Sequence, residues 1–95
     1  MQEEDYPNHS HQRLLEAVLK LKTKDEATRF FRDLLTLGEL DEFANRWEMA
    51  KLIDKGVPYQ KIAQEIGCST ATVSRTAQWL KHGLGGYRLV LERMK

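Results

Sequence analysis

Residues 59–81, YQKIAQEIGCSTATVSRTAQWLK, are the stretch that says most about the fold of this chain. A helix-turn-helix joins two short helices through a tight turn, so it needs a small residue where the helices meet and a residue that tolerates positive φ in the turn. Ala63 and Gly67 stand at those two places. The side chains expected to point inward are Ile62, Ile66, Cys68, Val73, Thr76, Ala77 and Leu80. The segment therefore predicts a helix-turn-helix over about residues 59–81.

The outward face of the second helix in this segment has the composition of a DNA-reading surface. Its residues are Thr70, Ala71, Thr72, Ser74, Arg75 and Gln78. Short hydroxyl and methyl groups suit base edges in the major groove, and the N-terminus of a helix favours the phosphate backbone. No acidic residue occurs between Glu65 and Glu92, so nothing in this stretch repels DNA. A solvent-exposed helix that only packs a bundle is the structural alternative.

Charge is divided unevenly along the chain, although the formal net charge is only +1. Residues 1–54 hold eight Lys or Arg and twelve Asp or Glu, whereas residues 55–95 hold seven and two. A basic C-terminal half favours a polyanionic partner. Ordinary scatter of surface charge is the alternative explanation.

The rest of the 95 residues also predicts helices, and there is neither an alternating β-branched run nor an Asn-Gly or Asp-Gly hairpin pair. Residues 1–9 are expected to form a flexible arm ahead of a helical domain over residues 10–95. About six helices are expected, over residues 10–22, 24–37, 41–55, 59–66, 70–81 and 87–94. The sequence thus predicts an all-α fold.

Residues at the expected helix ends support these boundaries. Ser10 is a good N-cap for the first helix, and Thr23 has Glu26 at capping-box spacing for the second. Gly38 is expected to end that second helix. Ser69 or Thr70 is expected to cap the helix that begins near residue 70. Gly56 is expected just past the third helix, and Pro58 at the first position of the fourth.

The first two expected helices carry wide apolar faces. Their apolar residues are Leu14, Leu15, Val18, Leu19 and Leu21, then Phe30, Phe31, Leu34, Leu35 and Leu37. A small domain has no room to cover two such faces by itself. We therefore expect a second copy of the chain to cover them.

Several classes of protein and of site are excluded by composition. The single cysteine, Cys68, allows no intramolecular disulfide, and no apolar run is long enough to span a membrane. The acidic start, MQEEDYPNHS, is unlike a secretory signal, so we expect a soluble, cytoplasmic protein. The histidines His9, His11 and His82 are scattered, and no catalytic or metal-binding motif occurs. We expect no enzyme activity, no cofactor and no metal.

The stretch from Leu40 to Met94 resembles the Trp repressor family, and the whole chain is similar to its YerC/YecD-type branch. The residues that carry the likeness are LDEFANRWEMAKLIDKG at 40–56, the segment 59–81, and the closing helix after Gly85 and Gly86. The resemblance implies an intertwined, all-helical homodimer. In that fold the outer helices of two chains interlock, and each chain projects one helix-turn-helix.

The resemblance and the composition of the segment together give candidate DNA contacts. Those expected to meet base edges are Thr70, Ala71, Thr72 and Ser74. Those expected to meet phosphates are Gln60, Lys61, Ser69, Arg75 and Lys81.

The resemblance also places an effector pocket. Arg46 and Arg75 match the two arginines that flank the indole of bound tryptophan in Trp repressors. Thr76 stands where those proteins have glycine, and Trp79 where they have serine. The indole of Trp79 is expected to fill the pocket, so a response to tryptophan is not expected. The alternative for the two arginines is a phosphate contact or a surface ion pair with Glu42, Glu48 or Glu92.

We therefore expect a sequence-specific, DNA-binding transcriptional regulator, most simply a repressor, that acts as a homodimer on a two-fold site. The alternative is a protein–protein interaction module that uses the helix-turn-helix fold without binding DNA. The two differ in salt dependence, because only the complex with double-stranded DNA weakens steeply as ionic strength rises.

Overall fold

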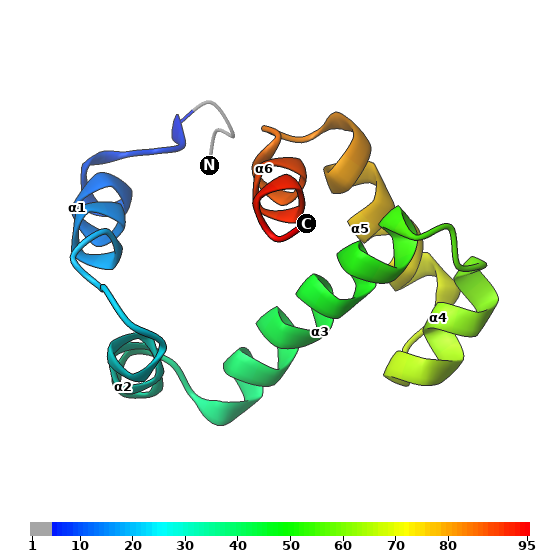
Figure 1. The fold of residues 1–95 in the computed structure, drawn as a ribbon, viewed down its shortest axis with the longest axis horizontal. Helices are drawn as coiled ribbons and strands as arrows, with labels where there is room; N and C mark the ends of the chain where they lie inside the picture. Colours follow the sequence, from blue (N-terminus) through cyan, green and yellow to red (C-terminus); the bar gives the residue numbers. More distant parts are fainter. Residues whose placement is uncertain (1–4) are drawn as a thin grey trace. The chain divides into compact units, whose positions relative to one another are not determined.

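The computed structural model describes residues 5–95, and within that range it contains helices and no strand (Figure 1). The elements are α1 (His9–Val18), α2 (Lys24–Leu34), α3 (Leu37–Asp54), α4 (Tyr59–Ile66), α5 (Thr70–His82) and α6 (Gly86–Arg93). The prediction of an all-α fold with about six helices is confirmed. The chain forms two compact units, one ending at Leu37 and the other covering Gly38–Lys95. Over the described residues, no helix is both long and apolar enough to cross a membrane.

The start of α1 differs from the prediction that Ser10 caps it. Asn8 is the N-cap instead, because its Oδ1 accepts the backbone N–H of His11 at 2.8 Å. In return, Nδ1 of His11 accepts the backbone N–H of Asn8 at 3.0 Å. This is a capping box in which histidine takes the place of the usual Glu or Gln. The predicted arm therefore ends before His9, and residues 1–4 of it lie outside the described residues. The helix also ends at Val18, short of the predicted Lys22.

The predicted cap of α2 is confirmed, but the predicted end is wrong. Oγ1 of Thr23 accepts the backbone N–H of Glu26 at 3.1 Å, and Glu26 reaches back to the N–H of Lys22 at 2.8 Å. The helix ends at Leu34 because Leu35 adopts extended backbone angles. Gly38 therefore does not end α2; it lies in the first turn of α3, which starts earlier than the predicted Asp41.

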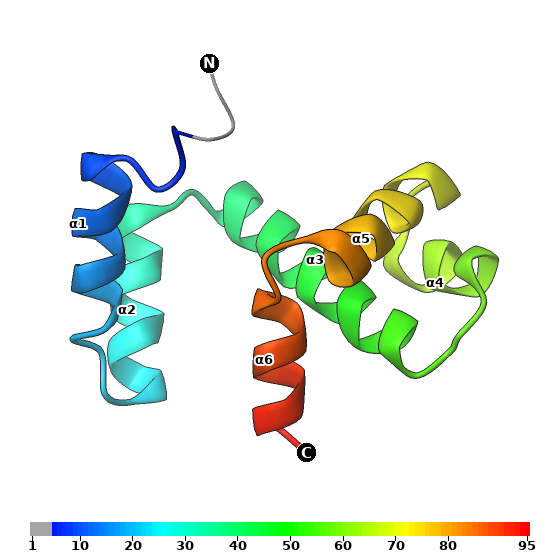
Figure 2. The ribbon, with the colours of Figure 1, turned by 90° about the horizontal axis from the view of Figure 1, so that it is seen from above.

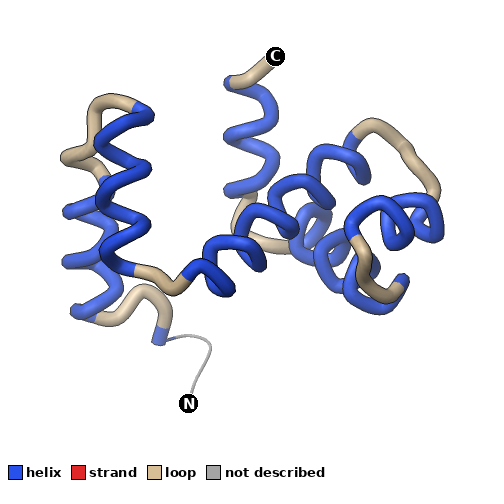
Figure 3. The backbone as a smooth tube through the Cα atoms, turned by 90° about the horizontal axis from the view of Figure 1, so that it is seen from below, coloured by secondary structure: helices blue, strands red, loops and turns tan. Residues whose placement is uncertain are grey.

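The N-terminal unit is a pair of helices with little core of its own. Helices α1 and α2 run side by side in opposite directions (Figures 2 and 3). Neither contains a buried residue. Phe30 and Phe31 are half-buried, with their rings edge to face at 5.5 Å, and Leu34 is 47% exposed. The excess of apolar surface expected on these two helices is thus present in the single chain.

The C-terminal unit, in contrast, is built on a buried core shared by α3, α4 and α5. Met49, Ile62, Ala63 and Val73 form this core, and both Ile62 and Val73 are 0% exposed. Burying side chains of that size contributes roughly 1.5–3 kcal/mol each. The helix-turn-helix is thereby held together within one chain.

Local residues set the turn of the helix-turn-helix as the sequence predicts. Gly67 has φ of 86°, a conformation open to glycine, and its N–H donates to the carbonyl of Ala63 at 2.8 Å. Ser69 caps α5 by accepting the N–H of Thr72 at 3.2 Å. Pro58 differs from the prediction, because it stands just before α4 as its N-cap.

Helix α6 is attached to α3 by two contacts. The ring of Tyr87 stacks on that of Trp47 with centroids 6.3 Å apart, and Arg88 forms an ion pair with Asp54 at 2.9 Å. Leu91 is the one buried residue of α6. The helix begins at Gly86, one position before the predicted Tyr87. These contacts hold α6 near the C-terminal ends of α3 and α5.

Candidate nucleic-acid interface and adjoining pocket

Helix α5 presents three faces with different surroundings. The inner face is the one predicted: Val73, Thr76, Ala77 and Leu80 are all buried. Thr76 also makes a polar contact there, since its hydroxyl donates to Sδ of Met49 in α3 at 3.5 Å. The inner face therefore joins α5 to α3 as well as to α4.

The outer face gathers four of the six predicted DNA contacts that lie on α5. Its exposed residues are Thr70, Ala71, Ser74, Gln78 and Lys81. At about 100° per residue these positions fall within one arc of the helix surface. Gln60 and Lys61 in α4 are exposed as well. The first turn of α5 holds no acidic residue. The outer face thus offers hydroxyl, methyl and amide groups together with a lysine, and no carboxylate.

The third face carries the predicted contacts Thr72 and Arg75 away from the others. Thr72 is half-buried, and its Oγ1 lies 3.0 Å from Oγ of Ser69. The hydroxyl groups of Ser69 and Thr72 are therefore engaged with each other at the N-terminus of α5. Arg75 is exposed and stands between this face and the outer one.

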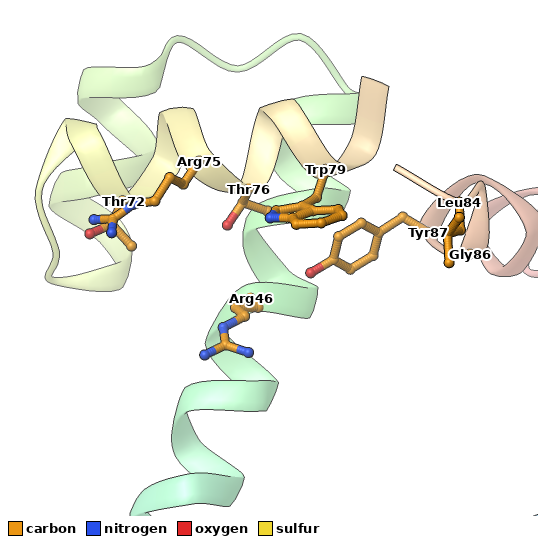
Figure 4. A pocket seen from close by; sticks show the side chains of 8 residues that line it. All are labelled: Arg46, Thr72, Arg75, Thr76, Trp79, Leu84, Gly86 and Tyr87. Carbon is orange, nitrogen blue, oxygen red and sulfur yellow. The ribbon is translucent and has the colours of Figure 1, made fainter. Parts of the chain in front are cut away.

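A pocket of about 800 Å³ opens beside this third face (Figure 4). It is lined by Arg46, Thr72, Arg75, Thr76, Trp79, Leu84, Gly86 and Tyr87. The structure thus brings together all four residues predicted for the effector pocket. The lining contains two guanidinium groups and no carboxylate, so an uncharged or anionic ligand suits it better than a cation.

Trp79 forms a wall of this pocket and does not close it. Its side chain is 63% exposed, and open space remains next to it. In Figure 4 the indole lies between Thr76 and Tyr87, while Arg75 extends toward Thr72. The prediction that the indole fills the pocket is therefore wrong for the single chain, because the side chain packs toward α6 instead.

The two pocket arginines differ in their neighbours. Arg46 lies 3.8 Å from the Glu42 carboxylate and 5.6 Å from the centre of the Phe43 ring. Both partners of this ion pair are more than half exposed, so the pair is weak. Arg75 makes no ion pair within the described part of the chain. Of the ion pairs considered for these arginines, the one between Arg46 and Glu42 is present in the described part of the chain. A phosphate contact by either arginine stays a prediction.

Tyr87, Leu84 and Gly86 are pocket residues that sequence reasoning missed. Tyr87 stands at helical spacing with Val90, Leu91 and Met94, a pattern that by itself predicts a packing role. The link between α5 and α6 brings Leu84 and Gly86 to the pocket beside the third face of α5. The path of this link depends on tertiary packing, which the local sequence pattern does not predict. Among residues 5–95, no cluster of His, Cys, Asp or Glu is suited to hold a metal ion.

Comparisons with known proteins agree with this architecture. The family model for the Trp repressor protein matches residues 9–95. The uncharacterised protein YerC of Bacillus subtilis (strain 168) is 42% identical over 82 residues, which are 86% of this chain and 79% of that protein. A crystal structure of a TrpR-like protein from Eubacterium eligens superposes with a TM-score of 0.89 at 37% identity, covering 96% of this chain and 94% of the other. A candidate Trp repressor from Staphylococcus aureus gives 0.88 at 38% identity, covering 99% and 94%.

Proposed function

Since the chain belongs to the Trp repressor family, we propose that it is a cytoplasmic, dimeric regulator of transcription, most simply a repressor, that binds double-stranded DNA through α4 and α5. The observation that carries this proposal is the outer face of α5, where four of the predicted contacts lie exposed in one arc without a carboxylate. We assign it no enzymatic activity, in keeping with a family of regulators.

Within the interface we assign base reading to Thr70, Ala71 and Ser74. Their short side chains permit the helix to enter the major groove closely. We assign phosphate contacts to Gln60, Lys61, Arg75 and Lys81, which flank that surface. Thr72 and Ser69 act indirectly, because their hydroxyl groups hold the N-terminus of α5 together.

A homodimer is the second part of the proposal. It is supported by the N-terminal unit, whose two helices bury no residue in the single chain although they carry Phe30, Phe31 and Leu34. A two-fold dimer presents two recognition helices, and half-sites about 34–36 Å apart, one turn of DNA, accommodate them.

Salt dependence of binding tests the proposed function against the rival interaction module. A duplex pool with randomised positions is passed over the protein, and the affinity of the selected duplex is measured from low to moderate salt. If Lys61, Arg75 and Lys81 of both subunits each neutralise a phosphate, the log–log slope is about −5. A protein that retains no duplex at low salt, or whose binding ignores salt, contradicts DNA binding and favours a protein-docking role.

We further propose that free tryptophan does not control this regulator. An effector acts only through a difference in affinity between two states. Here Trp79 forms a wall of the pocket and Thr76 lines it with a hydroxyl bonded to Met49, so less room remains than serine and glycine at these two positions would leave. Titration calorimetry with tryptophan is expected to be flat, with unchanged DNA affinity. Saturable heat at micromolar tryptophan, together with tighter DNA binding, would restore a tryptophan-responsive repressor.

A further inference from the structure

The first turn of α1 is capped by a histidine in a way that depends on the protonation of its ring. Nδ1 of His11 accepts the backbone N–H of Asn8 at 3.0 Å, and Oδ1 of Asn8 accepts the backbone N–H of His11 at 2.8 Å. A backbone N–H only donates, so Nδ1 presents its lone pair and the proton of the neutral ring is on Nε2. A protonated imidazole donates from both nitrogens and accepts at neither. The complete cap therefore requires the neutral form of His11.

The chain just before α1 is attached to the same turn. The ring of Tyr6 lies 5.1 Å from that of His11, measured between centroids, and Nε2 of Gln12 donates to the carbonyl oxygen of Pro7 at 3.2 Å. The side chain of His11 is half-buried in this arrangement, whereas that of His9 is exposed. His11 thus takes part in the contacts of both Tyr6 and Asn8, and it is the histidine of this turn with a structural role.

The surroundings of His11 contain no partner for a protonated ring. The end of α2 lies at the same end of the N-terminal unit as the start of α1 (Figure 2). The titratable and charged groups on the preceding segment, on the first turns of α1 and at that end of α2 are all exposed: Asp5, Tyr6, His9, Arg13, Arg32 and Asp33. Within residues 5–95, none of them forms an ion pair with His11. The N-terminus of a helix also disfavours a positive charge. Protonation therefore removes an acceptor and adds an unfavourable charge, and nothing in the described chain offsets either change.

Helix α1 has little else to hold its first turn in place. It is 10 residues long and contains no buried residue. Helices of this length are marginal by themselves in water, so the cap and the packing against α2 decide whether the turn forms. Histidine is the side chain that changes its charge between about pH 5 and 8. The cap of α1 is thus set to respond in the range where the pH of a cell or its surroundings changes.

We propose that the His11–Asn8 cap makes the start of α1 sensitive to protons. The stabilisation it gives is complete above the range in which histidine titrates, and it is lost as the pH falls through that range, because only the neutral ring accepts the N–H of Asn8. In the homodimer that we propose, α1 and α2 pair the two chains, so acid weakens the dimer through this cap. That last step rests on the proposed function, whereas the response of the cap itself does not.

Two glutamine variants provide a matched test of the cap. His11→Gln supplies a side-chain carbonyl that accepts at every pH and is a usual capping-box residue, whereas His9→Gln removes an exposed histidine from the same turn. Hydrogen exchange of the Asn8 amide, corrected for its intrinsic pH dependence, is followed from about pH 8 to pH 5. We expect the wild type and His9→Gln to lose protection roughly fivefold, the usual effect of losing a cap. His11→Gln is expected to keep its protection. Equal losses in all three proteins, or nitrogen NMR that places the proton of neutral His11 on Nδ1, would overturn the proposal.

Sedimentation of the same three proteins over the same pH range tests the effect on assembly. The dissociation constant of the dimer is expected to rise severalfold on acidification in the wild type and in His9→Gln, and to change less in His11→Gln. A rise that is the same in all three overturns the link between the cap and the dimer. A wild type that is monomeric at neutral pH refutes the proposed homodimer, and the exchange of the Asn8 amide still decides whether the cap responds to protons.

Discussion

The two compact units of this chain are both helical, yet they differ in what holds them together. The helix-turn-helix has its own core, in which Ile62 and Val73 are fully buried. The pair α1 and α2 has no buried residue, although its apolar stripes are wide. The helix-turn-helix unit is therefore stabilised by its own packing, whereas we propose that a second chain stabilises α1 and α2. This difference suits the DNA-binding dimer that we propose, because the proposed DNA-reading unit keeps its shape while the proposed dimerisation unit exposes its apolar face.

The largest effect is expected from a charge placed on the apolar face of α2. Phe31→Asp puts a carboxylate where we infer that a second chain packs, and a buried unpaired charge there costs several kcal/mol. We expect the dimer to dissociate and the helical circular dichroism to fall, since we propose that no stable folded monomer exists. Light scattering after size exclusion, combined with circular dichroism, measures both changes.

The control for this variant is Arg29→Asp, which places the same carboxylate on the exposed polar side of α2. It replaces a surface ion pair with Asp25, which contributes about 0–1 kcal/mol, by a like-charge pair at the same spacing, which costs a further ~0.2–0.5 kcal/mol. The comparison between the two units fails if Phe31→Asp behaves like this control.

A smaller effect is expected from a cavity in the core of the C-terminal unit. Ile62→Ala removes a fully buried side chain from the core of the helix-turn-helix, and such truncations lower the free energy of unfolding by about 2–5 kcal/mol. Because the inferred dimer contacts lie elsewhere, the variant should still dimerise. Urea unfolding at fixed protein concentration gives the stability, and light scattering gives the mass. A variant that no longer dimerises but keeps the stability of its helix-turn-helix would contradict the inference that the two units are stabilised separately.

The smallest effects on stability are expected from substitutions on the outer face of α5. These substitutions distinguish the proposed base contacts from the proposed phosphate contacts. Ala71→Arg introduces a long side chain where base edges are close, so the selected duplex is expected to lose its advantage over other sequences. Lys81→Ala is expected to weaken all duplexes about equally and to reduce the magnitude of the salt slope by roughly one contact per subunit. Filter binding with selected and scrambled duplexes distinguishes the two. A change of base preference in Lys81→Ala would show that the contacts are wrongly sorted.

The parts of the fold that sequence predicts well are those set by nearest neighbours. Thr23, Gly67 and Ser69 occupy their predicted places because a cap or a tight turn is decided within three or four residues. The start of α1 escaped prediction because His11 replaces the usual capping-box Glu or Gln. The prediction that Gly38 ends α2 was wrong because glycine is tolerated in the first turn of a helix, so its presence alone does not end one.

The sequence predicted part of the membership of the pocket but not its shape. Arg46, Arg75, Thr76 and Trp79 do line one pocket. Whether Trp79 fills that pocket or walls it depends on the path of the link from α5 to α6. That path depends on tertiary packing, of which the Trp47–Tyr87 stack is one contact. The faces of α5 likewise became distinct only when the half-burial of Thr72 was known.

Sedimentation of the intact chain, with circular dichroism on the same samples, tests most directly the claim that the N-terminal unit depends on a second copy. The samples are diluted from micromolar to nanomolar concentration. We predict twice the mass of one chain at micromolar concentration, and a loss of helix that accompanies dissociation on dilution. A compact monomer that keeps its full helical signal at micromolar concentration would contradict the account, because α1 and α2 would then be stable with their apolar faces uncovered.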